Sequence, residues 1–148
     1  MAPTIHASAV LLGARAALIR GPSGSGKSRL ALALLEAAIR GSLPFARLVA
    51  DDRADLEPGH GRLLVRPAPA LAGLIEVRGL GIRQVPYEPV AVVGVVIDLG
   101  AADAARLPEA AGQACKIERI TLPRLPVAAG QDALPLVFAH LRTADRLA

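Results

Sequence analysis

Apolar residues occur along the chain in short runs separated by turn residues, and one run has the spacing of a helix. Residues 7–12 and 15–19 are mostly apolar and lie on both sides of a Gly-Ala pair, which predicts a hairpin of two strands. Segment 29–40 carries leucines and an isoleucine on one helical face and predicts a helix. Gly41 and Pro44 are typical of the end of such a helix.

The rest of the chain continues this alternation of strand-like and helical patterns. Strands are predicted at 45–50, 74–78, 90–99 and 116–122, a second hairpin at 56–67, and a last helix at 131–147. In that helix Leu134, Val137, Phe138 and Leu141 share a face, and Pro135 lies in the first turn. We therefore predict a single α/β domain over residues 1–148, with a mixed central sheet, flanking helices and a C-terminal helix.

Composition narrows the class of protein. The 148 residues are 53% hydrophobic with only three aromatic residues, so the core must be aliphatic. The net charge is +4 and the basic residues are scattered, which argues against nucleic acid as a partner. Cys115 has no second cysteine to pair with and is interpreted as a core or strand residue.

The sequence shows no targeting or membrane segment. Residues 1–14 lack the basic start and polar cleavage region of a signal peptide, and no internal uncharged stretch is long enough to span a bilayer. We expect a cytoplasmic protein with no membrane partner.

One motif carries a specific chemistry. It matches GxxxxGK[ST] between a predicted strand and a predicted helix, and its residues are Gly21, Pro22, Ser23, Gly24, Ser25, Gly26, Lys27 and Ser28. Glycines let successive N–H groups point at phosphate oxygens, and the helix adds the positive end of its dipole. The lysine reaches the β and γ phosphates, and the serine offers a hydroxyl to Mg²⁺. This Walker A pattern predicts a P-loop that binds a nucleoside triphosphate.

Two predicted strands end in acidic residues that could serve phosphoryl transfer. Asp51 and Asp52 follow one strand and Asp98 ends another, so either strand could place a metal-binding carboxylate beside the phosphates. The repulsion between Asp51 and Asp52 suits a proton acceptor. The alternative is that this pair caps backbone N–H groups at a strand-end turn.

Two further candidates for the functional site rest only on their place in the predicted elements. Glu76 and Arg78 lie two apart on a predicted strand before a Gly-x-Gly sequence, which fits either a metal and phosphate site or a surface ion pair. His6 fits a packed or surface histidine as well as a catalytic one.

Together these segments resemble the catalytic domain of HPr kinase/phosphorylase, the kinase that modifies a serine of a bacterial phosphocarrier protein. The resemblance rests on His6 before a hairpin, on GPSGSGKS, on LVADDRADL at 48–56 and on LIEVRGLGI at 74–82. Arg106 and the strand-like KIERITLP at 116–123 extend it.

The resemblance implies a role for each of several residues. Asp52 would accept the proton of the target serine, with His6 supporting that carboxylate, and Lys27 and Arg106 would stabilise the transferring phosphoryl group. Ser28 and Glu76 would hold Mg²⁺, and Asp98 would be structural. The implied cofactors are ATP and Mg²⁺, the implied partner is an HPr-like phosphocarrier, and the implied assembly is a homo-oligomer, a hexamer in the family.

Departures from the family pattern shape the remaining expectations. The chain starts close to the catalytic domain, so we expect no N-terminal regulatory domain. Arg29 replaces a usual glutamate, and 124–131 lacks the basic stretch associated with the reverse, phosphorylase, reaction. Two alternatives stay open: a small-molecule kinase, and an ATP-sensing regulator without catalysis.

Overall fold

The first two long strands form the predicted hairpin. In this computed structural model, which describes residues 3–143, β2 (Ala7–Leu12) pairs antiparallel with β3 (Arg15–Arg20), with Ala7 opposite Arg20. The turn between them places Gly13 at φ 71°, a conformation that glycine adopts without steric cost.

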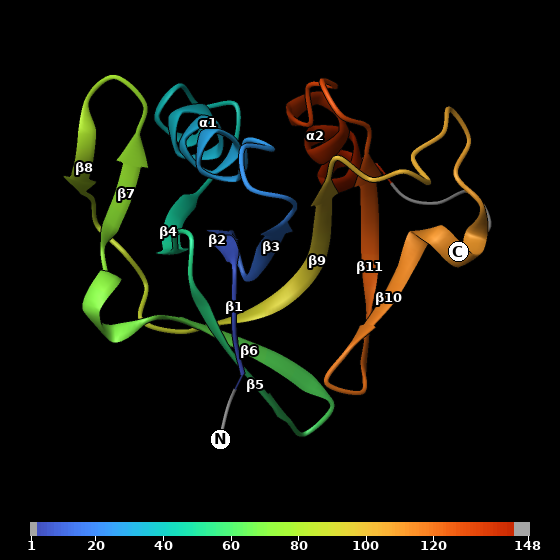
Figure 1. Cartoon of the computed structure of the whole chain (residues 1–148), viewed down its shortest axis with the longest axis horizontal. Helices are drawn as coiled ribbons and strands as arrows, with labels where there is room; N and C mark the ends of the chain where they lie inside the picture. The colour runs from blue at the N-terminus through green and yellow to red at the C-terminus, as the bar shows by residue number, and fades with distance from the viewer. Residues whose placement is uncertain (1–2, 144–148) are drawn as a thin grey trace.

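A curled, mixed sheet of nine strands forms the middle of the molecule (Figure 1). Seven strands follow the order β1-β5-β6-β9-β3-β2-β4, and β11 pairs with both β9 and β10. The strands of this sheet other than β2 and β3 are β1 (Thr4–Ile5), β4 (Ala46–Ala50), β5 (Ala54–Gly59), β6 (Arg62–Pro67), β9 (Ala91–Leu99), β10 (Ala114–Ile117) and β11 (Ile120–Val127). The remaining elements are the hairpin β7 (Leu74–Val77) and β8 (Gly81–Gln84), and the 3-10 turns η1 (Pro69–Leu71) and η2 (Ala110–Gln113).

Strand β9 organises the sheet because it runs parallel to β3 on one side and β11 on the other. The carboxyl ends of these three strands therefore meet at one edge, which is where ligands bind in open α/β sheets. An irregular register at Gly94 places Val93 and Val95 in different core clusters, although a regular strand would put both on one face.

Two helices, α1 (Lys27–Ile39) and α2 (Leu134–Arg142), lie on the same side of the sheet (Figure 1). They pack on one apolar cluster, and a second cluster lies among β2, β3, β5, β6 and β9. The buried apolar residues of the described chain are all alanine, valine, leucine or isoleucine, which confirms the aliphatic core. No helix in residues 3–143 is long and apolar enough to cross a membrane.

The mixed α/β architecture is confirmed, while three local predictions were wrong. The single strand predicted at 116–122 is the hairpin β10–β11, because Glu118 and Arg119 both adopt left-handed φ angles of 49° and 68° and reverse the chain. Helix α2 begins at Leu134 because the turn at 129–130 and the irregular residues 131–133 precede it, and the predicted part after residue 143 lies outside the described residues. Leu141 is 42% exposed and does not share the buried face.

Candidate active site

The GPSGSGKS segment forms the loop between β3 and α1. The Ser25 N–H donates to the Pro22 carbonyl at 3.0 Å, which closes the loop's first turn. Gly26 precedes the helix with φ 99°, and neither a side-chain cap nor an acidic residue occupies the first turn of α1. The first N–H groups of the helix are therefore available to an anion.

Close packing inside the loop explains its first glycine. A Cβ at Gly21 would lie 2.5 Å from the Ser25 Oγ and 3.0 Å from the Leu99 carbonyl oxygen, so only glycine fits. The Lys27 Nζ folds back over the loop and donates to the carbonyls of Gly21 at 2.8 Å and Pro22 at 3.2 Å. No protein carboxylate competes for this ammonium group among the described residues.

Asp51 is the carboxylate that the fold brings to the loop. It is 5% exposed at the end of β4, and its Oδ1 accepts hydrogen bonds from the hydroxyls of Ser28, at 2.7 Å, and Ser8, at 2.8 Å. Its Oδ2 accepts the Glu76 N–H at 3.0 Å. Asp51 thus connects Ser28, in the first turn of α1, to the backbone of β7.

Asp52 lies beside this cluster, with an exposed side chain. Its backbone is left-handed, at φ 68°, and its N–H donates to the Ser8 Oγ at 3.3 Å. The Asp52 carbonyl accepts the Ala7 N–H at 3.1 Å, which fixes the neighbouring His6 near the same edge. The described contacts include no hydrogen bond from the His6 ring, which is exposed.

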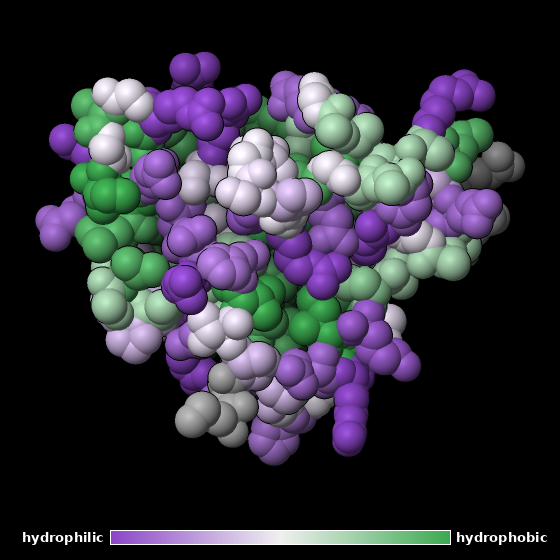
Figure 2. Space-filling view, viewed as in Figure 1, coloured by the Kyte–Doolittle hydropathy of each residue, from purple (hydrophilic) through white to green (hydrophobic). Residues whose placement is uncertain are grey.

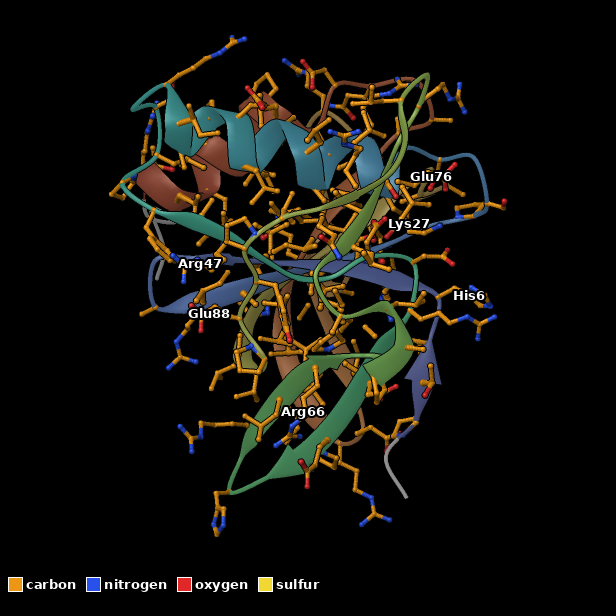
Figure 3. The ribbon with its side chains drawn as sticks, turned by 90° about the vertical axis from the view of Figure 1, so that its left-hand side faces the viewer. His6, Lys27, Arg47, Arg66, Glu76 and Glu88 are labelled. Carbon is orange, nitrogen blue, oxygen red and sulfur yellow. The ribbon has the colours of Figure 1, made fainter. Side chains whose placement is uncertain are left out.

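The side chains of His6, Lys27 and Glu76 lie on one side of the molecule, at the end where α1 begins (Figure 3). Glu76 is exposed on β7, and Arg78 lies in the turn after that strand. No ion pair joins Glu76 to Arg78 among the described residues. The surface ion pair considered for these two residues is therefore not formed.

Ser8 holds both acidic residues and gives a testable prediction. Because its hydroxyl is fully buried and donates to the buried Asp51 carboxylate, Ser8→Ala should lower the free energy of unfolding by about 1–3 kcal/mol. Urea unfolding without nucleotide measures this. Ser25→Ala is the matched control, because the Ser25 Oγ is buried without a partner and its removal should cost little. Equal stability of both variants and the unaltered chain would contradict the role of Ser8.

Asp98, the other candidate at a strand end, is held by two arginines. It accepts from Arg20 at 2.7 and 2.8 Å and from Arg124 at 2.6 Å. Burial acts to raise the pKa of Asp98, but the hydrogen bonds from the two guanidinium groups outweigh it, so the pKa lies below its ordinary value. These contacts join β3, β9 and β11, which supports a structural role. Desolvation raises the pKa of the nearby Cys115 thiol, a partly buried strand residue as predicted.

The depressed pKa of Asp98 makes stability depend on pH. Asp98→Asn should lower the free energy of unfolding by about 2–4 kcal/mol at pH 7, because two arginines lose their charged partner. The contribution of Asp98 is complete above the ordinary aspartate pKa of about 4 and is lost as the pH falls through the lower folded pKa. Urea unfolding at pH 7 and pH 3 should therefore show a difference that shrinks at acid pH.

A matched control is Asp103→Asn, since Asp103 pairs with Arg124 at 2.7 Å but is exposed. This variant should be much less destabilised. A difference between Asp98→Asn and the unaltered chain that is the same at both pH values would contradict the proposed ion-pair network.

Arg106 lies in the loop after β9, and its side chain is exposed without a described hydrogen bond. Arg124 anchors this loop on both sides of Arg106, by donating to Asp103 and, at 2.9 Å, to the Gly112 carbonyl. The structure therefore fixes the two ends of the loop, and within residues 3–143 it shows no hydrogen bond or ion pair between Arg106 and the cluster around Ser28.

Residues 1–88 match the family described as the HPr Serine kinase C-terminal domain, and this stretch contains the loop, both acidic residues and Glu76. The chain belongs to this HPr serine kinase family. Arg106 lies outside the matched residues, so its role rests on the resemblance of its own segment.

Curated relatives match a little over half of the chain. The HPr kinase/phosphorylase of Clostridium tetani is 40% identical over 89 residues, which cover 55% of this chain and 27% of the relative. That of Streptococcus thermophilus is 42% identical over 83 residues, covering 55% of this chain and 25% of the relative. The chain aligns with about a quarter of the length of these relatives.

A solved structure extends the similarity to nearly the whole chain. The Hpr(Ser) kinase/phosphatase from Coxiella burnetii is 25% identical and superposes with a TM-score of 0.74. The match covers 95% of this chain and 94% of that one. The family fold therefore continues through β9, β11 and α2, beyond the 88 residues that the family pattern matches.

Ser8 was missed as a site residue, and the residue pattern left Asp51 as one of three candidate carboxylates, with Asp52 and Asp98. The apolar run that ends in Asp51 could have singled it out, because a carboxylate directly after a buried strand faces the sheet edge. Ser8 gives no such signal, since a serine within an apolar strand is ordinary until its partner 43 residues away is known.

Proposed function

We propose that this chain is a single kinase domain that transfers the γ-phosphoryl group of ATP to a serine of an HPr-like phosphocarrier. One observation supports this above all: the Asp51 carboxylate lies 2.7 Å from the Ser28 hydroxyl directly behind the glycine loop, in a member of the HPr serine kinase family. Phosphoryl transfer needs this combination of phosphate cradle and carboxylate.

In this proposal the loop is a P-loop that binds the triphosphate. Backbone N–H groups of Gly24 to Ser28 would surround the phosphate oxygens, where the uncapped start of α1 favours negative charge. The Lys27 ammonium would exchange the Gly21 and Pro22 carbonyls for oxygens of the β and γ phosphates.

The residues beside the loop fit Mg²⁺. Ser28, Asp51 and Glu76 offer only oxygen donors, which this hard cation prefers. Within residues 3–143 no group of three or more histidine, cysteine or acidic side chains could hold a metal alone. Mg²⁺ in kinases binds one or two carboxylates together with substrate phosphates. Bound there, it would neutralise charge on the phosphates.

The exposed carboxylate of Asp52 is the proposed proton acceptor. The serine oxygen of the carrier forms a bond to the γ phosphorus while the bond to the β-phosphate oxygen breaks, and ADP leaves. Asp52 takes the serine proton, with His6 near its backbone. Lys27 and Arg106 stabilise the transferring group, and the second of these roles requires the loop of Arg106 to approach the phosphates.

The segment after β11 favours the forward reaction. Ala128 and Gln131 face the loop across a cavity, and neither carries the positive charge associated with phosphorylase activity in the family. Inorganic phosphate would therefore find no cation on this wall. We propose that kinase activity exceeds phosphate-driven dephosphorylation.

A homo-oligomer is the proposed assembly, and an apolar surface supports it. Leu80 and Ile82, at the turn and strand of the β7–β8 hairpin, are 62% and 64% exposed. Figure 2 shows this hairpin as a largely green area on the left of the molecule. A second copy would remove this surface from water, and the mass of the purified chain in solution tests for it.

A labelling experiment tests the function. The purified chain is incubated with Mg²⁺, γ-labelled ATP and an HPr-type carrier, either intact or with its target serine replaced by alanine. Label on the intact carrier alone supports serine transfer. ATP binding without transfer to the carrier or to metabolites would indicate a sensing regulator, and transfer to a metabolite would indicate a small-molecule kinase. Adding phosphate to the labelled carrier then measures the reverse reaction.

A further inference from the structure

Arg124, on β11, makes four hydrogen bonds that tie the loop 100–113, here called the Arg106 loop, to the sheet. Its Nη1 and Nη2 donate to the two carboxylate oxygens of Asp103 at 2.7 and 3.0 Å, and its Nη1 also donates to the Gly112 carbonyl at 2.9 Å. Its Nε donates to Asp98 at 2.6 Å. Because Arg106 lies between Asp103 and Gly112 in the sequence, one guanidinium group holds the loop on either side of it.

The two limbs of the Arg106 loop approach each other closely where Arg124 holds them. A Cβ at Gly112 would lie 3.0 Å from the Asp103 Oδ2, so a larger residue there would push the limbs apart. The Arg124 side chain is 14% exposed, and its planar fork matches the Asp103 carboxylate with two hydrogen bonds. The ammonium group of a lysine cannot reproduce this geometry. The attachment therefore depends on an arginine.

The Arg106 loop begins in contact with the glycine loop. Gly100, the first residue after β9, has φ 66°, and a Cβ there would lie 3.5 Å from the Pro22 Cδ. A Cβ at Gly21 would lie 3.1 Å from that of Leu99, the last residue of β9. From this contact the chain runs to η2 and β10 on the right of the molecule (Figure 1). The start of the loop is therefore fixed against the proposed phosphate site, and its later part is held by the contacts from β11.

A chain of ion pairs also joins the two loops. Asp98 accepts from Arg124 and, at 2.7 and 2.8 Å, from Arg20, which directly precedes the glycine loop. Arg124 continues the chain to Asp103. Asp98 and Arg124 are both mostly buried, and a network with bidentate geometry keeps its arrangement better than isolated surface pairs do. The Arg106 loop is therefore connected to the glycine loop through side chains as well as through the backbone.

We propose that Arg124 is a positioning residue for phosphoryl transfer, which holds the Arg106 loop so that Arg106 reaches the transferring phosphoryl group. The inference rests on the proposed function, in which Arg106 stabilises that group. With Asp103 and Gly112 held, only the arc between them needs to move toward the phosphates, so less conformational freedom is lost when Arg106 contacts them. Arg124 itself donates to protein groups, so its replacement should leave ATP binding unchanged.

The test is a double-mutant cycle of Arg124→Lys and Arg106→Ala, measured by steady-state transfer to the carrier. Arg124→Lys keeps a positive charge beside Asp98 but loses the fork to Asp103. Its kcat should fall about tenfold or more, while its KM for ATP stays within about twofold of that of the unaltered chain. In an Arg106→Ala background the same substitution should lower kcat no further, because no arginine is left to position.

Arg20→Lys is the matched control, since Arg20 shares Asp98 with Arg124 and makes no described hydrogen bond to the Arg106 loop. Both variants should lose stability in urea. Any loss of kcat in Arg20→Lys should be the same with and without Arg106. Hydrogen exchange adds a readout that does not depend on transfer, because the amides of 104–111 should exchange faster in Arg124→Lys and at the normal rate in Arg20→Lys.

Three kinetic outcomes overturn this inference and leave the proposed kinase activity intact. One is a normal kcat in Arg124→Lys, another is an equal loss of kcat with and without Arg106, and the third is a normal kcat in Arg106→Ala itself. Unchanged hydrogen exchange at 104–111 in Arg124→Lys would also overturn it. If the unaltered chain transfers no phosphoryl group to the carrier, the proposed function fails, and the positioning role of Arg124 fails with it.

Discussion

Lys27→Ala is expected to abolish measurable phosphoryl transfer while the chain stays folded. Within residues 3–143 the Lys27 ammonium donates hydrogen bonds to two loop carbonyls and is not part of the apolar core, so its loss should not change the free energy of unfolding appreciably. Transfer should fall at least about 10²–10³-fold, because a positioned donor to the transferring phosphoryl group is lost. ATP affinity should also fall.

Steady-state transfer to the carrier and calorimetric ATP binding measure the two effects. The chain has one other lysine, Lys116, which is exposed on β10, so Lys116→Ala is the matched control and should be fully active. Lys27→Arg keeps the charge but not the compact ammonium geometry, and should remain strongly impaired. A folded Lys27→Ala variant with normal transfer would end the P-loop proposal.

Local signals in the sequence predict the parts of the fold that form between neighbours. The β2–β3 hairpin and the loop before α1 depend on runs and turns a few residues long, and both are present in the structure. The turn of the β10–β11 hairpin was missed because Glu118 and Arg119 adopt left-handed backbone conformations without a glycine or asparagine to signal them. Strand β1 has only two residues, and its partners lie about 50 positions away.

In the candidate site, too, local features are predicted from the sequence and long-range contacts are not. The spacing of the GPSGSGKS motif is local and predicts a loop between β3 and α1, which the structure contains. Which carboxylate approaches Ser28 depends on the packing of β4 against α1, and pattern alone left Asp51, Asp52 and Asp98 as options. Asp98 instead pairs with two arginines that lie 78 and 26 residues away in the sequence. No local pattern predicts contacts at such separations.

Asp52→Asn should separate nucleotide binding from transfer. Asparagine keeps the size of the side chain and tolerates the left-handed backbone at φ 68°, whereas alanine would add strain at this position. Because one negative charge near the triphosphate is removed, ATP affinity should be unchanged or slightly higher. Transfer should fall by about 10²–10⁴, the usual contribution of a positioned acid or base. His6→Ala should give a smaller loss of transfer with unchanged ATP affinity.

Asp51→Asn is the comparison that distinguishes the two neighbouring acidic residues. Asp51 is buried and accepts three hydrogen bonds, so this variant should lose stability and require more Mg²⁺, whereas Asp52→Asn should keep the stability and Mg²⁺ dependence of the unaltered chain. Unfolding in urea, Mg²⁺ titration of activity and the rate of transfer give each variant its own profile. If Asp52→Asn transfers at a normal rate and Asp51→Asn is inactive but folded, Asp51 is the proton acceptor, and the exposed carboxylate of Asp52 serves another purpose.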